Sequence, residues 1–292
     1  MIKSLYAGVS GMKSFQVKMD VVANNIANVN TTGFKSGRAS FQDMLSQTVG
    51  NAQAATDNNL GGVNARQIGL GVKVGSIGTM MTGGAPQATN RDLDFAIEGE
   101  GFFAVSSDAL GTNKLYTRDG AFYRDNSGNL VNSSGLRVLG YKPAAPGDAT
   151  VDDTELVPLD IPTNITIGAD DLELQSYAIN GTGQVIGVYS DANTSRSVLL
   201  GQVGLSTFSN PSGLSKTGGN NYVVSDNSGE AQEGIAGDPG YGTILQGFLE
   251  MSNVDLANEF TDMIVTSRAY QANAKTITTS DEMLQELINL KR

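Results

Sequence analysis

The chain has 292 residues, a formal net charge of −11, and no cysteine, histidine or tryptophan. The acidic balance argues against nucleic acid as a partner, and the missing side chains exclude disulfides, thiolate nucleophiles and histidine ligands for metals. No apolar run reaches the length of a membrane span, so we predict no membrane insertion.

The first predicted element is a long helix at the N-terminus. Residues 1–33 carry apolar side chains at helical spacing without an interrupting proline, and the turn-prone segment 28–33 ends the helix. The start of the chain is amphipathic and lacks the apolar core and cleavage site of a signal peptide. We therefore expect a protein that is either cytoplasmic or exported without cleavage.

A polar segment follows the first helix. Residues 34–70 are rich in glycine, asparagine, glutamine and alanine. This composition predicts an extended linker arm, with one short helix near residues 41–47.

The central part of the chain, residues 71–249, has the pattern of a β-rich domain. Short apolar runs are separated by turn sequences such as Asp119-Gly120 and Ser134-Gly135, which is typical of antiparallel hairpins. A small insertion rich in proline and aspartate interrupts the pattern near residues 142–162. The predicted fold class is α+β and multidomain, with a central antiparallel, barrel-like all-β domain between helical termini.

Two acidic groups in this region allow either a structural or a chemical interpretation. The first group comprises Asp92, Asp94, Glu98 and Glu100. These carboxylates could bind a cation or act as a glycosidase pair, but their alternation with apolar residues favours a solvated strand face. The second, residues 125–129, is similar to a calcium loop but has Leu136 where the bidentate glutamate belongs, which favours a hairpin turn. We predict no catalytic residue, no cofactor and no metal site.

The C-terminal segment, residues 250–292, predicts a second long helix that pairs with the first as a coiled coil. Ser252 followed by Asp255 resembles a capping box. Gly8 and Gly11 weaken the first helix, so we expect the isolated pair to be marginal and to be completed by neighbouring copies. The predicted assembly seam consists of Ile2, Leu5, Val9, Met12, Met19, Ile26, Leu256, Phe260, Met263, Tyr270, Ile277, Leu284 and Ile288.

An asparagine-rich motif at the end of the first helix closely resembles the signature of the bacterial flagellar rod and hook proteins. Its residues are Ala23, Asn24, Asn25, Ile26, Ala27, Asn28, Gly33 and Phe34. Four further segments resemble motifs of the same family, in the same order: residues 93–103, 116–122, 252–260 and 268–273. Together these matches extend over most of the chain.

The resemblance implies a self-assembling structural subunit and not an enzyme. Copies would form a hollow helical tube, with the terminal helical domain (residues 1–33 and 250–292) on the inner wall, the arm between neighbours and residues 71–249 as the outer domain. Within the family, residues 67–74 and 276–287 favour the flagellar hook, a flexible tube that passes motor torque to the filament. The alternative is a distal rod subunit of the basal body.

The implied partners are further copies of the chain, the rod, the hook cap, the hook–filament junction proteins and the export apparatus, at an extracellular flagellar location. Two other classes stay open from the residues alone. One is a surface-binding β domain or adhesin on a coiled-coil stalk, and the other is an enzyme that acts through carboxylates. Regular tubes under polymerising conditions would distinguish the structural subunit from the adhesin.

Overall fold

The computed structural model describes residues 2–54, 61–143, 151, 155–167, 170–191 and 195–290. The chain forms two compact units, and each is built from segments that are distant in sequence. Unit 1 contains residues 1–28, 36–80 and 254–292, and unit 2 contains residues 29–35 and 81–253. The chain therefore passes between the units four times. The boundaries expected from the sequence, at residues 33, 70 and 249, stay a prediction about domain organisation.

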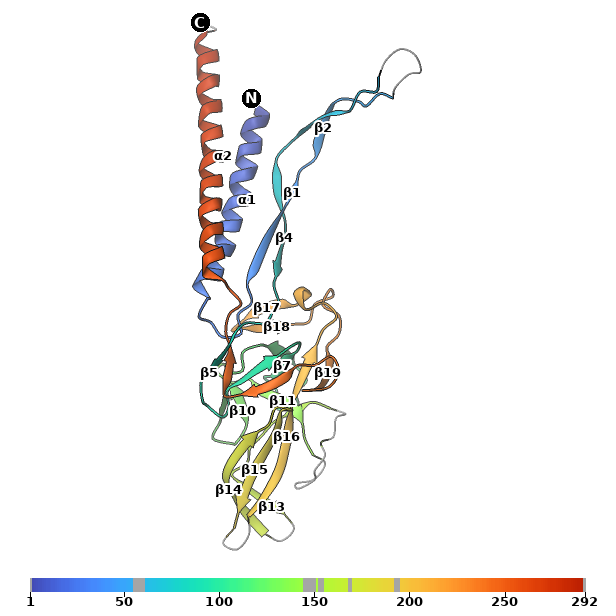
Figure 1. Cartoon of the computed structure of the whole chain (residues 1–292), viewed down its shortest axis with the longest axis vertical. Helices are drawn as coiled ribbons and strands as arrows, with labels where there is room; N and C mark the ends of the chain where they lie inside the picture. Colours follow the sequence, from blue (N-terminus) through green and yellow to red (C-terminus); the bar gives the residue numbers. More distant parts are fainter. Residues whose placement is uncertain are drawn as a thin grey trace. The chain divides into compact units, whose positions relative to one another are not determined.

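Unit 1 contains two antiparallel helices, α1 (Ile2–Ala27) and α2 (Leu256–Leu290) (Figure 1). Both long terminal helices expected from the sequence are confirmed. Small residues allow the two helices to approach closely: a side chain added at Gly8 would meet Ile277 at 3.1 Å, and one at Gly11 would meet Asn273 at 3.0 Å. The two glycines thus lie at the helix contact, where their lack of a side chain offsets their low helix propensity. Coiled-coil packing of the pair stays a prediction.

Asp255 caps the N-terminus of α2. Its Oδ1 accepts hydrogen bonds from the backbone N–H groups of Ala257 at 2.9 Å and Asn258 at 3.5 Å, which are the second and third helical positions. The expected capping box with Ser252 as the cap is therefore wrong. The helix begins three residues later, at Leu256, because Asp255 itself satisfies the free N–H groups.

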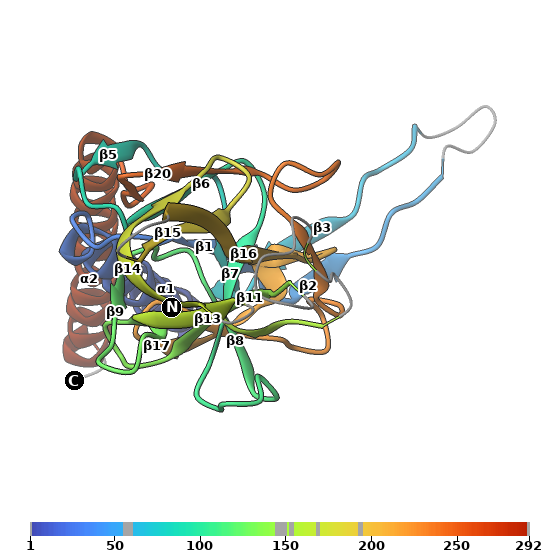
Figure 2. The same ribbon diagram turned by 90° about the horizontal axis from the view of Figure 1, so that it is seen from below.

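A long β-ribbon completes unit 1 (Figures 1 and 2). Strands β1 (Gly37–Asp43) and β4 (Val72–Thr79) pair antiparallel, and so do β2 (Ser46–Gly50) and β3 (Arg66–Gly69). The short helix expected near residues 41–47 is wrong, because residues 41–43 pair with β4 and residues 46–47 pair with β3, and local composition does not reveal these distant partners. The ribbon contacts α1, where the Phe15 and Phe41 rings lie 5.5 Å apart.

Unit 2 is the β-rich part of the chain, as expected. Its described elements are β5 (Pro86–Ala88), β6 (Phe95–Glu98), β7 (Phe102–Ser106), β8 (Lys114–Thr117), β9 (Phe122–Arg124), β10 (Leu130–Asn132), β11 (Arg137–Tyr141), β12 (Val157–Pro158), β13 (Asn164–Ile167), β14 (Asp170–Ile179), β15 (Gln184–Ser190), β16 (Ser195–Thr207), the 3-10 helix η1 (Pro211–Gly213), β17 (Ser215–Gly218), β18 (Asn221–Val223), β19 (Gln232–Ile235), β20 (Thr243–Gln246) and β21 (Phe248–Glu250). Every strand pair among them is antiparallel.

The strands of the largest sheet follow an open path, β13-β14-β15-β16-β11-β7-β8-β18-β17, with shorter strands attached to it. The barrel-like form expected from the sequence is therefore not found, since no described strand joins β13 to β17. The residues of the end strand β17 are all exposed, so it has no apolar face that closure would bury. Much of the expected insertion near residues 142–162 lies outside the described residues.

Strand β7 lies at the centre of unit 2 and is buried on both faces. Phe103 and Val105 pack into one apolar core, and Phe102 and Ala104 pack into a second core on the opposite face. This arrangement explains why the strand is a continuous apolar run instead of an alternating one.

Candidate functional site

A line of polar and small side chains on α2 lies at the contact between the helices of unit 1, beside the predicted seam residue Ile277. On α2 this line comprises Glu259, Thr266, Asn273 and Ser280, which are spaced by seven residues. Thr266 and Ser280 are 1% and 3% exposed, and Ser280 Oγ lies 3.5 Å from Ser4 Oγ. Much apolar surface on the same helix is left on its outer sides.

The structure places the predicted seam residues in two groups. The side chains of Leu5, Met12, Met19, Ile26, Met263, Ile277 and Leu284 are half-buried, and those of Val9, Leu256, Phe260, Tyr270 and Ile288 are exposed. The side chain of Ile2 lies outside the described part of the chain. Exposed apolar residues on one helix are available to a partner, and their role in assembly stays a proposal.

Asn25 joins the three components of unit 1. Its Nδ2 donates to the Gly37 carbonyl at 2.9 Å and to Glu259 Oε1 at 3.0 Å, and its Oδ1 accepts from the Gly37 N–H at 2.9 Å. One buried amide thus connects α1 to the start of β1 and to the first turns of α2. Burial raises the pKa of Glu259, and the hydrogen bond from Asn25 partly opposes that rise.

Asn24 and Asn28, two other asparagines of the motif, are hydrogen-bonded to each other at the C-terminal end of α1. The Asn28 side chain donates to the carbonyl of Asn24 at 2.9 Å and to its Oδ1 at 2.8 Å. These bonds satisfy acceptors at the helix end. The remaining motif residues on α1, Ala23 and Ala27, are exposed.

Gly33 belongs to unit 2 and occupies a position that only glycine fits. Its φ is 66°, and an added side chain would lie 2.6 Å from the backbone nitrogen of Asp119. Its N–H donates to the Glu250 carbonyl at 2.8 Å, and the neighbouring Thr32 hydroxyl donates to Asp119 Oδ1 at 2.9 Å. Phe34, half-buried, lies 5.0 Å from the Lys216 amine. The end of the motif is therefore fixed within the β-rich unit.

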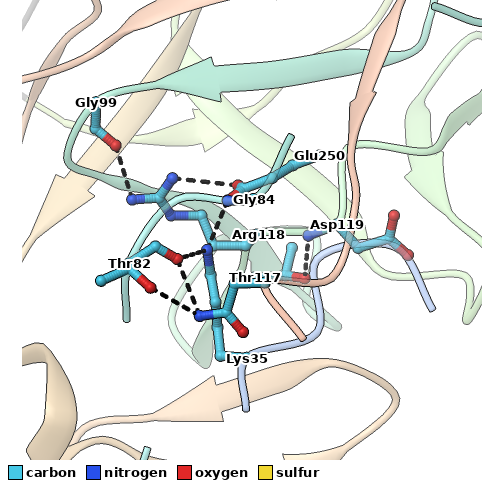
Figure 3. A network of polar contacts seen from close by, with 9 residues as sticks. Lys35, Thr82, Gly84, Gly99, Thr117, Arg118, Asp119 and Glu250 are labelled. Atoms are coloured by element: carbon cyan, nitrogen blue, oxygen red, sulfur yellow. Dashed lines mark hydrogen bonds and ion pairs between the residues drawn. The ribbon is translucent and has the colours of Figure 1, made fainter. Parts of the chain in front are cut away.

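A buried group of charges lies directly after the motif (Figure 3). We call Lys35, Arg118 and Glu250 the Lys35 cluster; their side chains are 0%, 2% and 3% exposed. Lys35 Nζ lies 2.5 Å from Glu250 Oε1 and donates to the Thr82 carbonyl at 2.8 Å. Arg118 Nη1 lies 3.2 Å from Glu250 Oε2. The cluster thus binds together three segments that are distant in sequence.

Backbone groups complete the Lys35 cluster. The Gly84 N–H donates to Glu250 Oε1 at 2.8 Å, and Arg118 Nη2 donates to the Gly99 carbonyl at 2.9 Å. Burial lowers the pKa of Lys35, and the Glu250 carboxylate opposes that shift only in part. Sequence reasoning missed this cluster, although Lys35 and Arg118 stand within or beside the family-like motifs.

Two of the acidic positions considered as chemical sites have structural roles: Asp94 forms an ion pair, and residues 125–129 form a hairpin turn. Asp94 is 1% exposed, with Arg91 Nη1 3.3 Å from its Oδ1, so the expected solvated face is wrong at this position. The backbone of Asp94 also forms an isolated antiparallel bridge with Ala121. The turn at residues 125–129 is confirmed, since it joins the paired strands β9 and β10.

Neither a metal-binding group nor a membrane span is found in the described part of the chain. No cluster of three or more Asp or Glu residues there is arranged to hold a metal ion. No described helix is both long and apolar enough to cross a membrane.

The first prediction concerns the Lys35 cluster. Replacing Lys35→Met removes one partner of a buried ion pair, so we expect the free energy of unfolding of the β-rich unit to fall by about 3 kcal/mol. The matched control is Lys142→Met in the same unit, whose partner Asp160 is 38% exposed. Loss of such a surface pair should cost less than about 1 kcal/mol. Urea unfolding followed by circular dichroism measures both, and equal effects would contradict the role of the cluster.

The second prediction compares Asp119, whose pKa is raised in the folded protein, with Asp125, whose pKa is lowered. Burial raises the pKa of Asp119 above its ordinary value of 3.8, so its ionised form makes the fold less stable once the pH exceeds the folded-state pKa. Asp119→Asn should therefore stabilise the protein at pH 7, with a gain that shrinks as the pH falls toward 4. Asp125 is the control: hydrogen bonds, chiefly from Asn129, lower its pKa, so Asp125→Asn should destabilise at pH 7. Melting temperatures across this pH range test both, and effects of the same sign would disprove the assignment.

Three models of protein families match this chain. They are described as "Flagella basal body rod protein" (residues 5–35), "Flagellar hook protein FlgE/F/G D1 domain" (residues 96–187) and "Flagellar basal body rod FlgEFG protein C-terminal" (residues 245–290). The first match contains the asparagine-rich motif together with Lys35, and the last contains Glu250 and α2.

Several characterised proteins are similar over their whole length. The flagellar basal-body rod protein FlgG of Bacillus subtilis (strain 168) is 46% identical over 293 residues, covering 100% of both chains. The flagellar hook protein FlgE of Borreliella burgdorferi is 32% identical over 448 residues, and the rod protein FlgG of the same organism is 39% identical over 293 residues; both alignments cover 100% of both chains. The chain therefore belongs to the family of bacterial flagellar rod and hook structural proteins.

Proposed function

We propose that this chain is a structural subunit of the flagellar basal-body rod, polymerising into its axial structure. The observation that supports the rod is that almost every residue of a rod relative has a counterpart in this chain. The alignment with the Bacillus subtilis rod protein spans 293 residues and covers all 292 residues of this chain, so it leaves almost no residue of that relative unmatched. The identity over this alignment, 46%, is also higher than the 32% found with the Borreliella burgdorferi hook protein.

The flagellar hook is the second candidate, favoured by the segments at residues 67–74 and 276–287. The alignment with the Borreliella burgdorferi hook protein spans 448 residues and exceeds the length of this chain by 156. That hook protein therefore contains a large part with no counterpart here. A short hook subunit is compatible with the 32% identity. The part of that hook protein that has no counterpart in this chain favours the rod.

In the proposed assembly, the helices of unit 1 form the inner wall of the tube and the β-rich unit forms the outer layer. The support comes from unit 1, whose internal helix contact uses small and polar residues such as Gly11 and Ser280. Phe260 and Ile264 on α2 are 50% and 63% exposed, which leaves apolar surface for neighbouring copies. Contacts between unlike surfaces that do not close into a ring produce helical polymers.

The remaining parts of the proposal follow from the family. The partners would be further copies of this chain, adjoining rod or hook subunits, the hook cap, the hook–filament junction proteins and the export apparatus. The protein would be exported to the flagellum without cleavage of a signal peptide. Its task would be mechanical, since the family consists of structural subunits rather than known enzymes.

The third prediction separates rod from hook. If the proposal is right, deleting the gene should leave basal bodies with incomplete rods, and complementation with the intact gene should restore them. Electron microscopy of purified basal bodies is the measurement, and a deletion of a known hook-cap gene gives a matched control with complete rods. Complete rods without hooks in the deletion strain would contradict the rod assignment and favour the hook.

A further inference from the structure

The antiparallel register of the two helices leaves one end of α2 beyond α1. Ser4 lies opposite Ser280, Gly11 opposite Asn273, and Asn25 opposite Glu259. Since α1 begins at Ile2, the register places the last described residues of α2 past that end. We call residues 283–290 the α2 overhang; at about 1.5 Å per residue it is roughly 12 Å long.

The side of α2 that faces α1 changes character in the overhang. Along the helix pair, one line of residues on this side, spaced by multiples of seven, presents the polar or small residues Glu259, Asn273 and Ser280, next to Ile277 at the Gly8 contact. Seven residues after Ser280, the same side presents Leu287, which is 51% exposed. On this line, the first large apolar side chain therefore lies where the register places the end of α1.

Leu287 is part of a cluster of exposed apolar residues. Met283, Ile288 and Leu290 are 50%, 66% and 83% exposed. One exposed leucine would need no explanation, but four large apolar side chains within eight residues of a helix indicate a surface that a partner covers. The side chain of the overhang residue Leu284 is half-buried.

The charge of this region restricts what can cover it. Asp281, Glu282 and Glu286 are exposed, and no lysine or arginine occurs among residues 276–290. The two cations at positions 291 and 292 lie outside the described part of the chain. A partner that presents apolar side chains between cations would fit the overhang best.

The outer face of α1 has these properties. Tyr6 is 70% exposed and Val9 is 38% exposed, and the exposed lysines Lys3 and Lys13 flank them. No acidic residue occurs before Asp20. In the same chain Lys3 donates a hydrogen bond to Gln47, and Lys13 is exposed to solvent.

We propose that the α2 overhang of one copy packs on the Tyr6–Val9 face of α1 in a second copy. In this contact the lysines of α1 lie opposite Glu286 of the overhang and the adjacent Glu282. The contact joins two different surfaces, so it is heterologous and can continue from copy to copy, as a helical polymer requires. The inference rests on the proposed function, because it requires copies of this chain to assemble.

Cysteine cross-linking tests this contact directly, since the chain has no cysteine of its own. Two full-length variants, Tyr6→Cys and Leu287→Cys, are mixed with an excess of the unmodified chain under polymerising conditions and then oxidised. The control replaces Tyr6→Cys by Ala23→Cys, at an exposed position near the other end of α1. A disulfide needs Cα atoms within about 7 Å, so we expect at least about tenfold more cross-linked dimer from the first pair than from the control.

Each outcome of the cross-linking has a defined meaning. Tubes that form with equal cross-linking in both mixtures overturn this contact while leaving the proposed function intact. A cross-link from Leu287→Cys to a different protein also overturns it. So does a cross-link within one chain between Leu287→Cys and Val49→Cys in strand β2 of the ribbon. If the unmodified chain forms no tubes at all, the proposed function fails and this contact fails with it.

A charge exchange tests the contact without cysteines. Lys13→Glu should raise the critical concentration for assembly about tenfold, which corresponds to ~1.4 kcal/mol of like-charge repulsion. The double variant Lys13→Glu/Glu286→Lys restores opposite charges across the proposed contact and should return the critical concentration close to that of the unmodified chain. A double variant that assembles no better than Lys13→Glu alone would overturn the proposal.

Discussion

The carboxylate of Glu250 is the group on which the arrangement of the β-rich unit at its chain crossings depends. It accepts bonds from Lys35, Arg118 and the Gly84 N–H, which lie in three separate segments. The segments at Lys35, Gly84 and Glu250 each lie a few residues from a passage between the two units. A buried carboxylate left without partners would cost several kcal/mol, so the loss of any one of these partners should destabilise the β-rich unit.

The helical unit follows a different principle. Its closest helix contacts use Gly8, Gly11, Asn25 and small or polar residues of α2, and large apolar side chains such as Phe260 and Ile264 stay exposed in the single chain. Helices of this kind gain most of their stability from packing rather than from intrinsic propensity. The exposed apolar residues therefore favour a subunit whose helices are stabilised further when copies assemble, while the two apolar cores of the β-rich unit are complete within one chain.

The sequence predicted both long helices, the β-rich centre and the family, because these depend on periodicity and on short motifs. It did not predict the small and polar residues at the helix contact, since the apolar line through Phe260 and the small-residue line through Thr266 both follow helical spacing. The burial of Asp94 and the pairing of residues 37–43 with β4 depend on distant partners. The Lys35 cluster was missed for the same reason, because Lys35 and Glu250 stand 215 positions apart.

The central claim is that assembly covers apolar surface on α2 that the single chain leaves exposed. Amide hydrogen exchange, measured on the isolated chain and on assembled tubes, tests it most directly. The account predicts that residues 256–265 and 283–290 gain strong protection on assembly, while strands β7 and β11 are equally protected in both states. Equal protection of these α2 segments before and after assembly would contradict it.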